Sequence, residues 1–462
     1  MVASFRRRHP PATYPSLHPG PGKPPLTPPR PPPRGLPRPV PPLVGALAGL
    51  AGACHTPPGD ATFQPASAAR AVGFPIPLHV QIRRIGVALL WAFMTNIAHA
   101  QAPHPGANPQ KVVYPGESII EAAGYPALVK FEPGAANAPL VVFITGGGVL
   151  ARVAYGHPEG RSADFLAHWL KQEGTPFLAI SYPMGHPVFA KAYPDFSMTD
   201  WGEQSAEIVA RHVKANDLPA RVVVLGWSMA GRIAQPIAAS LRKRGIEIEL
   251  FVAMAAATAL PNLLPGLATV KPQPSGLAGV AGAYTDALLL NLRERNAETG
   301  HTVIDPAIFP AQFMGDYPIR LAAAALKFEN SAFMPDLLGD QDGTGAWRYA
   351  SFPPLALLTH EAAADARHAL MDRSTWGFYI SQNLSETHVF ARVKNLLKLP
   401  PDRWRRINDL VYGAPARLTI VMQGNHMFFV GETGAKATVA ALKDLRGRAV
   451  ALDAELDAAT KE

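Results

Sequence analysis

One serine in the chain has neighbours that would allow it to act as a nucleophile. Ser228 lies in the run Leu225-Gly226-Trp227-Ser228-Met229-Ala230-Gly231, between an apolar strand-like segment and a helix-like one. A serine hydroxyl is a weak nucleophile, so it needs an exposed position, a nearby base and backbone donors for an oxyanion. A tight strand-to-helix turn supplies these, but only small residues fit two positions to either side of the serine. Gly226 and Ala230 are both small, which favours acyl transfer; a serine that caps a helix is the alternative.

This motif resembles the nucleophile elbow of the α/β-hydrolase family, Gly-x-Ser-x-Gly, with Ala230 in place of the second glycine. The resemblance covers about residues 127–450. It implies a serine hydrolase in which Ser228 is the nucleophile, and in which the acid and then the histidine follow it along the chain.

Two further motifs agree with this resemblance. The last strand-like segment ends in Gln423-Gly424-Asn425-His426-Met427, and the family places its catalytic histidine in such a loop. His426 is therefore the implied general base. The first strong strand ends in Ile144-Thr145-Gly146-Gly147-Gly148, which resembles the glycine-rich loop of the family. The N–H of Gly147 or Gly148, together with that of Met229, would form the oxyanion hole.

The acid of the triad is open at this stage. In the family it follows the strand before the last one, which here leads into His360-Glu361-Ala362-Ala363-Ala364-Asp365. Glu361 comes at once and Asp365 four residues later, and neither has the expected spacing. We favour Glu361, because Asp365 resembles part of a helix, and keep Asp365 as the alternative.

The glycine-rich loop also matches a dinucleotide-binding pattern, Gly146-x-Gly148-x-x-Ala151. That pattern needs a helix to begin at once and an acidic residue at the end of the next strand. Here the helix is delayed until about Arg161 and the next strand ends without an acid. We therefore predict no cofactor. A His-Glu-x-x-His motif is missing and no metal-ligand spacing is visible, so we predict no metal site.

The elements that position these motifs alternate along the chain. Apolar runs without polar alternation predict strands buried on both faces, and segments with helical periodicity separate them. The fold class is therefore α/β, with a doubly wound, mostly parallel sheet of α/β-hydrolase type. The predicted strands are 140–145, 177–182, 221–225, 248–254, 354–359 and 417–422; the predicted helices are 161–173, 198–216, 229–244, 282–296 and 432–455.

Two insertions interrupt this alternation. Residues 258–350 are too long for a plain loop and predict a cap over the site. A second, small helical insertion, with helices near 390–398 and 402–411, is expected within the second part of the core, 351–462. The first part of the core is predicted over 127–257, preceded by a linker over 101–126.

The charge of the chain is concentrated in its first hundred residues. The whole chain carries 43 Lys+Arg and 35 Asp+Glu, but residues 1–100 hold ten of the basic residues, one acidic residue and the only cysteine, Cys54. We expect residues 1–79, rich in proline and arginine, to be a disordered or mis-assigned leader, with the true start near Val80. Arg83-Arg84, an apolar run and Ala98-His99-Ala100 resemble a signal peptide over 80–100, so we expect export to the periplasm or the medium.

Together these features predict an exported hydrolase that cleaves a carboxylic ester with an apolar acyl or alcohol group. We expect no nucleic-acid partner, because residues 101–462 are nearly neutral, and no permanent membrane span. The oligomeric state stays open. The alternatives are a non-catalytic binding protein on the same fold, or a cofactor-free lyase, thioesterase or amidase.

Overall fold

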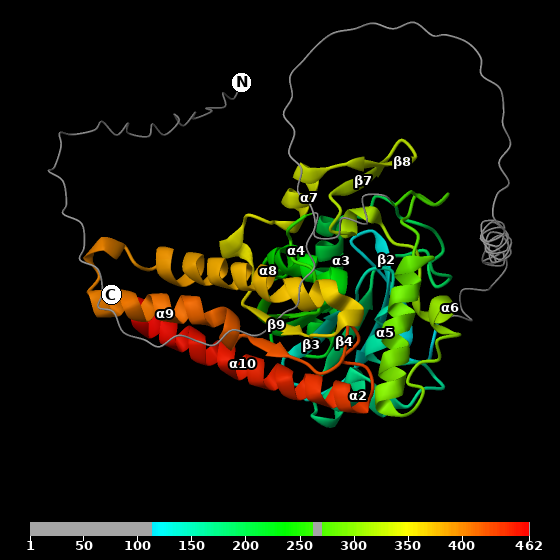
Figure 1. Ribbon diagram of the computed structural model, residues 1–462, viewed down its shortest axis with the longest axis horizontal. Coiled ribbons are helices and arrows are strands. Elements are labelled where there is room, and N and C mark those ends of the chain that lie inside the picture. Colours follow the sequence, from blue (N-terminus) through cyan, green and yellow to red (C-terminus); the bar gives the residue numbers. More distant parts are fainter. Residues whose placement is uncertain (1–112, 262–269, 462) are drawn as a thin grey trace, which may run out of the picture. The chain divides into compact units, whose positions relative to one another are not determined.

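The structure is a computed structural model that describes residues 113–261 and 270–461 (Figure 1). Its centre is an eight-stranded sheet in the order β1-β2-β4-β3-β5-β6-β9-β10. β1 and β4 each pair with β2 in antiparallel fashion, and all other neighbours in the sheet are parallel. The strands are β1 (Glu117–Ala122), β2 (Tyr125–Glu132), β3 (Leu140–Ile144), β4 (Phe177–Ser181), β5 (Arg221–Trp227), β6 (Glu247–Met254), β9 (Leu355–Thr359) and β10 (Thr419–Val421). The predicted leader and signal peptide lie outside the described residues.

Buried apolar strands give this sheet its parallel centre. Every residue of β3, β4 and β9 is buried, as a sheet covered on both faces requires. All six predicted strands are present. β10 is shorter than the predicted 417–422, because the preceding helix continues to Arg417.

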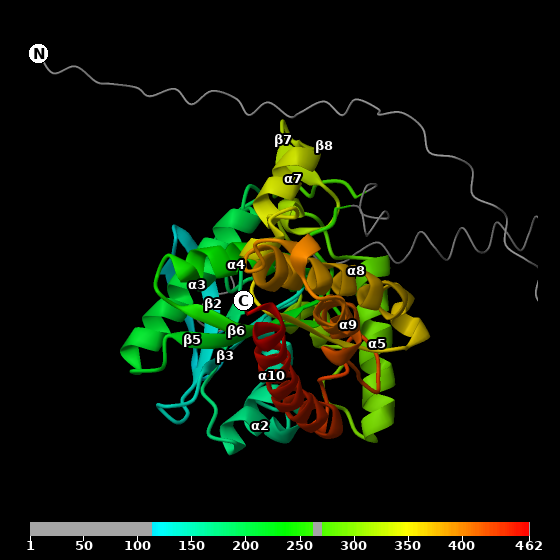
Figure 2. The same cartoon turned by 90° about the vertical axis from the view of Figure 1, so that its left-hand side faces the viewer.

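Helices cover both faces of the sheet, which confirms the doubly wound class. Figures 1 and 2 show α3 and α4 on one side of the sheet and α2 and α10 on the other. None of the helices in the described residues is long and apolar enough to cross a bilayer. The covering helices are α2 (Leu166–Gln172), α3 (Met198–Ala215), α4 (Ala234–Arg242), which continues the 3-10 turn η4 (Ser228–Ile233), and α10 (Glu432–Thr460).

The sheet begins earlier than the sequence indicates. A linker is expected over 101–126, but β1 starts at Glu117 and forms a hairpin with β2. The turn uses Ala123 and Gly124, both with positive φ. β1 is a half-exposed edge strand of mixed polar and apolar residues, so it lacks the continuous apolar run by which the inner strands are recognised.

Two long segments separate the last three strands of the core. The cap between β6 and β9 contains α5 (Ala283–Thr299), α6 (Phe309–Phe313), the hairpin β7 (Leu326–Glu329) and β8 (Ala332–Pro335), and α7 (Leu337–Thr344). The second insertion, between β9 and β10, contains η8 (Ala363–Asp365), α8 (Ala366–Leu384), the π-helical η9 (Ser385–Phe390), η10 (Leu396–Lys398) and α9 (Pro401–Arg417). The helix expected near 390–398 is wrong, since only η10 forms there, whereas the helix expected near 402–411 is confirmed within α9. In Figures 1 and 2, α8, α9 and α10 lie side by side.

Candidate active site

Ser228 lies in a strained turn between β5 and η4. Its φ is +56°, a left-handed conformation that is uncommon for a residue with a side chain and often marks a functional site. A Cβ at Gly226 would lie 2.5 Å from Cζ of Phe251 and 2.9 Å from the carbonyl oxygen of Ala230. The glycine two residues before the serine is therefore required by packing, as the sequence predicts.

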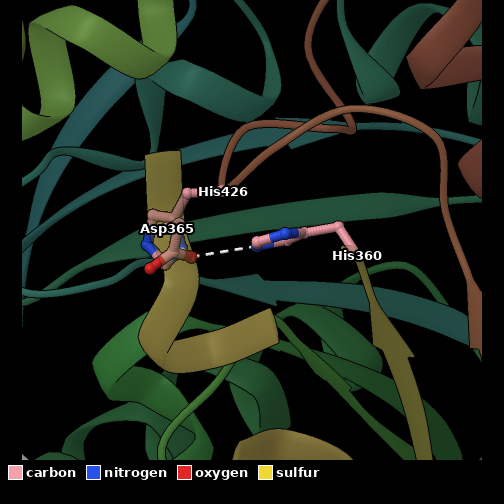
Figure 3. Close-up of side chains that lie close together, drawn as sticks. All are labelled: His360, Asp365 and His426. Atoms are coloured by element: carbon pink, nitrogen blue, oxygen red, sulfur yellow. Dashed lines mark hydrogen bonds and ion pairs between the residues drawn. The ribbon is translucent and has the colours of Figure 1, made fainter. Parts of the chain in front are cut away.

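Asp365 and His426 meet beside this turn although 61 positions separate them. Nδ1 of His426 lies 2.7 Å from Oδ2 of Asp365. His360, directly after β9, approaches the same carboxylate oxygen through Nε2 at 2.9 Å. Figure 3 shows the ring of His360 pointing at the Asp365 carboxylate. Nδ1 of His360 accepts the N–H of Ala362 at 3.2 Å, so Nε2 carries the proton and donates it.

The electrostatics of this group keep Asp365 charged and His426 neutral. Burial raises the pKa of Asp365, but the charge that His426 carries when protonated and the hydrogen bonds from His360 and His426 together outweigh this effect, so the pKa of Asp365 lies well below the usual value. Burial lowers the pKa of His426 below its ordinary 6.5, and the charge of Asp365 offsets this only in part. The ionised Asp365 holds the proton of His426 on Nδ1, which leaves Nε2 as a proton acceptor.

Glu361, the acid that the sequence favours, points elsewhere. Its carboxylate pairs with Arg373 on the surface, and its side chain is 69% exposed. The side chain of Asp365 is only 15% exposed and faces His426. The geometry therefore favours Asp365, the alternative that the sequence leaves open, over Glu361. The short turn η8 places this residue within reach of the histidine, which the sequence spacing does not indicate.

The backbone of His426 is held from two sides. Nε1 of Trp227, the residue before the serine, donates to the carbonyl oxygen of His426 at 2.9 Å. Oδ1 of Asn291, on the cap helix α5, accepts the N–H of His426 at 3.2 Å. The histidine loop is thus fixed to both the serine turn and the cap.

The glycine-rich loop offers one of its two candidate donors. The N–H of Gly148 already donates to the hydroxyl of Tyr182 at 2.7 Å, and that hydroxyl donates to the carbonyl oxygen of Gly146 at 3.1 Å. In a trans peptide the N–H and C=O point in opposite directions, so the N–H of Gly147 points away from Tyr182. The carbonyl oxygen of Gly147 also points away from Tyr182, and it accepts a hydrogen bond from the hydroxyl of Tyr284 at 2.6 Å.

The N–H of Gly147 is therefore the one that could bind an oxyanion together with the N–H of Met229. Both residues line the pocket that contains Ser228. The N–H of Met229 lies in the first turn of η4, where backbone donors have no partner within the helix. Of the two glycines that the sequence leaves open, the geometry favours Gly147 over Gly148.

These groups converge on one pocket of about 400 Å³, a size that suits a small-molecule substrate. Ser228, Asp365 and His426 all line it, and the cap contributes α5 and the residues near Tyr317. Its walls are mostly apolar. The pocket lies where the parallel strands end, which is the usual place for a ligand in an α/β sheet.

A second histidine–aspartate pair lies against the first. The ring of His368, on α8, stacks on that of His426 with centroids 4.9 Å apart, and its Nδ1 lies 3.0 Å from Oδ1 of Asp372. Burial lowers the pKa of His368, but the charge and hydrogen bond of Asp372 outweigh it and raise the pKa overall. The positive charge of His368 in turn helps to lower the pKa of His426.

The His360, Asp365 and His426 group also has the composition of a metal site. The three ligand atoms lie within 4.8 Å of one another. However, both histidines place nitrogen atoms at hydrogen-bond distance from the same carboxylate oxygen, and the acceptor role of His360 Nδ1 leaves its Nε2 protonated. A protonated nitrogen is a donor and cannot bind a metal, so the geometry favours a hydrogen-bonded group.

The strand order, the serine at positive φ after β5 and the histidine loop after β10 define the α/β-hydrolase fold. No protein-family model matches the sequence, and no curated protein matches it.

Several solved structures are similar to the chain. A thermophilic esterase from Thermogutta terrifontis is 13% identical, with 71% of this chain and 99% of that chain covered and a TM-score of 0.38. The thioesterase domain from the curacin biosynthetic pathway is 13% identical, with 71% and 97% covered and a TM-score of 0.33. An N-acyl homoserine lactone degrading enzyme is 13% identical, with 71% and 99% covered and a TM-score of 0.38. At these values the assignment of the fold rests on the strand order of this chain.

Several residues of the site are missed by the sequence reasoning. His360 has a local signal, because it directly follows a predicted strand. Tyr284 and Asn291 have no local sequence signal, since they belong to the cap and contact loops more than 130 positions away.

Proposed function

We propose that the protein is a serine hydrolase that cleaves carboxylic esters through an acyl-enzyme intermediate. Ser228 is the nucleophile, His426 the general base and Asp365 the acid that orients it. The observation that carries this proposal is the 2.7 Å contact between His426 Nδ1 and Asp365 Oδ2 in the pocket that holds Ser228. A pocket with these three groups supports hydrolysis better than simple binding.

In the proposed mechanism, Oγ of Ser228 attacks the ester carbonyl while Nε2 of His426 accepts its proton. Among the described residues the Ser228 hydroxyl has no hydrogen-bond partner. The mechanism requires it to come within hydrogen-bond reach of His426 Nε2 in the substrate complex, where catalytic hydrogen bonds often tighten. Asp365 stabilises the resulting imidazolium. The N–H groups of Gly147 and Met229 stabilise the oxyanion. His426 then protonates the leaving alcohol and later activates the water that releases the acid.

Labelling with a fluorophosphonate probe tests the catalytic role directly. We expect a covalent adduct on the wild-type protein, and none on Ser228→Ala or His426→Ala, because each lacks one part of the activated nucleophile. Folding of each variant is checked by thermal melting. An unlabelled wild-type protein would instead favour a non-catalytic binding protein.

A panel of chromogenic esters, thioesters and amides over a range of acyl lengths tests the substrate class. We expect esters to be cleaved fastest, because an alcohol is a better leaving group than an amine. Product analysis by mass spectrometry distinguishes hydrolysis from a lyase reaction, which would yield no acid and alcohol pair.

We also propose that the protein is exported. This rests on the signal-like segment 80–100 of the sequence. N-terminal sequencing of the protein from its native source is expected to begin at Gln101. A native N-terminus before Val80 would contradict both the export signal and the assignment of residues 1–79 as a leader.

A further inference from the structure

A buried arginine with unused donors lies in the wall of the active-site pocket. Arg232 is four residues after Ser228 in η4, is 0% exposed, and lines the pocket. Its Nη2 donates to Asp340 on α7, while Nε and Nη1 have no hydrogen-bond partner among the described residues. Buried donors of a charged group are costly to leave unpaired. These donor atoms are covered by the pocket wall, so an acceptor on a ligand would remove this cost once that wall shifts to admit it.

A second arginine faces the same pocket from α8. Arg367 is exposed, lines the pocket, and forms no ion pair with an acidic residue of the described chain. By contrast, Arg373, six residues further along α8, pairs with Glu361 outside the pocket. Arg367 is thus a cation positioned at the pocket and available to a ligand.

The acidic groups near the pocket are already paired. Of the described residues that line it, Asp365 is the one carboxylate, and it accepts from His426 and His360. Asp340 pairs with Arg232 from outside the lining. His368 also lines the pocket, and Asp372 lies 3.0 Å from its Nδ1, so this pair is balanced within the wall. The side chains that line the pocket thus include two arginines and one carboxylate, in a largely apolar wall where electrostatic interactions are strong.

We propose that the substrate is an ester that carries a carboxylate, bound by Arg232 and Arg367 while the ester carbonyl lies at Ser228. The apolar wall, which includes Leu288, Ala322 and Ala323, suits a short hydrocarbon segment between the two groups. This inference rests on the proposed ester hydrolysis and adds the class of ester.

Matched pairs of esters test the proposal. The first pair carries the charge on the acyl group: 4-nitrophenyl hydrogen glutarate and 4-nitrophenyl hexanoate. The second carries it on the alcohol: 4-acetoxybenzoate and 4-tolyl acetate. We expect the wild-type kcat/KM to favour the charged member of at least one pair by about ten- to hundred-fold, since hydrogen bonds to charged groups have that value. The pair that shows the preference identifies which side of the ester carries the carboxylate.

Variants then attribute the preference to the two arginines. Arg232→Met is expected to reduce the charged-to-neutral ratio about ten-fold or more, mainly through KM, and Arg232→Lys to retain part of it. Because Arg232 is buried and its variants can fail to fold, Arg367→Gln provides an independent test and is expected to reduce the ratio several-fold. Arg373→Gln, on the same helix but outside the pocket, should leave the ratio unchanged.

Each result bears on the proposal. A wild-type enzyme that cleaves both members of both pairs equally, or a preference that survives in Arg232→Met and Arg367→Gln, would overturn the inference and leave ester hydrolysis intact. A wild-type protein that cleaves no ester and does not react with fluorophosphonate would remove both.

Discussion

Replacing Asp365 by asparagine tests which acid orients His426. The substitution preserves the shape of the side chain but removes the charge that lies 2.7 Å from His426 Nδ1. An asparagine can also present its N–H₂ group to Nδ1, which would favour the wrong tautomer of the histidine. Both effects act on the transition state, in which His426 becomes positively charged.

The expected loss is large because the carboxylate is shielded from water. The side chain of Asp365 is 15% exposed, so its charge acts through a medium of low dielectric constant. Loss of the equivalent carboxylate in a serine triad lowers kcat by about 10⁴-fold, which corresponds to about 5.5 kcal/mol of transition-state stabilisation. The pKa of His426 should also fall further, since the charge of Asp365 is what raises it against burial.

Glu361→Gln is the matched control for this prediction. Its carboxylate is 69% exposed and pairs with Arg373, and exposed pairs contribute only about 0–1 kcal/mol to stability. We expect kcat for 4-nitrophenyl butyrate to change by less than about two-fold, with an unchanged melting temperature.

The assay is the steady-state hydrolysis of 4-nitrophenyl butyrate, with the rate of fluorophosphonate labelling as a second measure. If Asp365→Asn kept more than about one tenth of the wild-type kcat while folded, the proposed role of Asp365 as the orienting acid would be refuted. A loss of more than about ten-fold in Glu361→Gln would refute it as well.

Four further predictions concern other groups in and around the site. Gly226→Ala should lower the free energy of unfolding by roughly 1–3 kcal/mol, because the new Cβ would lie 2.5 Å from Phe251 Cζ; an unchanged melting temperature would contradict this. Since burial lowers the pKa of His426 and the base acts in its neutral form, kcat/KM should fall on the acid side with an apparent pKa below 6.5; a higher value would argue against the assignment. His360→Phe should cost roughly 1.5–3 kcal/mol in urea unfolding, since it removes a donor to a charged carboxylate. Dialysis against a chelator should leave ester hydrolysis unchanged, whereas a loss restored by Zn²⁺ would show that the His360 and Asp365 group binds a metal.

Much of the core could be predicted because its signals are local. The inner strands are continuous apolar runs, and the helices between them have clear periodicity. The strained turn at Ser228 has a local signature too, because the small residues Gly226 and Ala230 are needed wherever such a turn forms. The edge strand β1 lacks such a local signal, because half of it faces solvent and its apolar pattern is weak.

The sequence by itself determined the order of the strands along the chain, the turn that carries the proposed nucleophile Ser228, and the loop that carries His426. Only the tertiary structure decided which carboxylate reaches that histidine and which glycine N–H is available. Glu361 and Asp365 are four positions apart, and their distance to His426 depends on how η8 turns after β9. Gly147 and Gly148 are neighbours, and they differ because Tyr182 occupies the N–H of Gly148 alone. Both differences depend on contacts between segments that are far apart in the sequence, and local sequence patterns carry no information about such contacts.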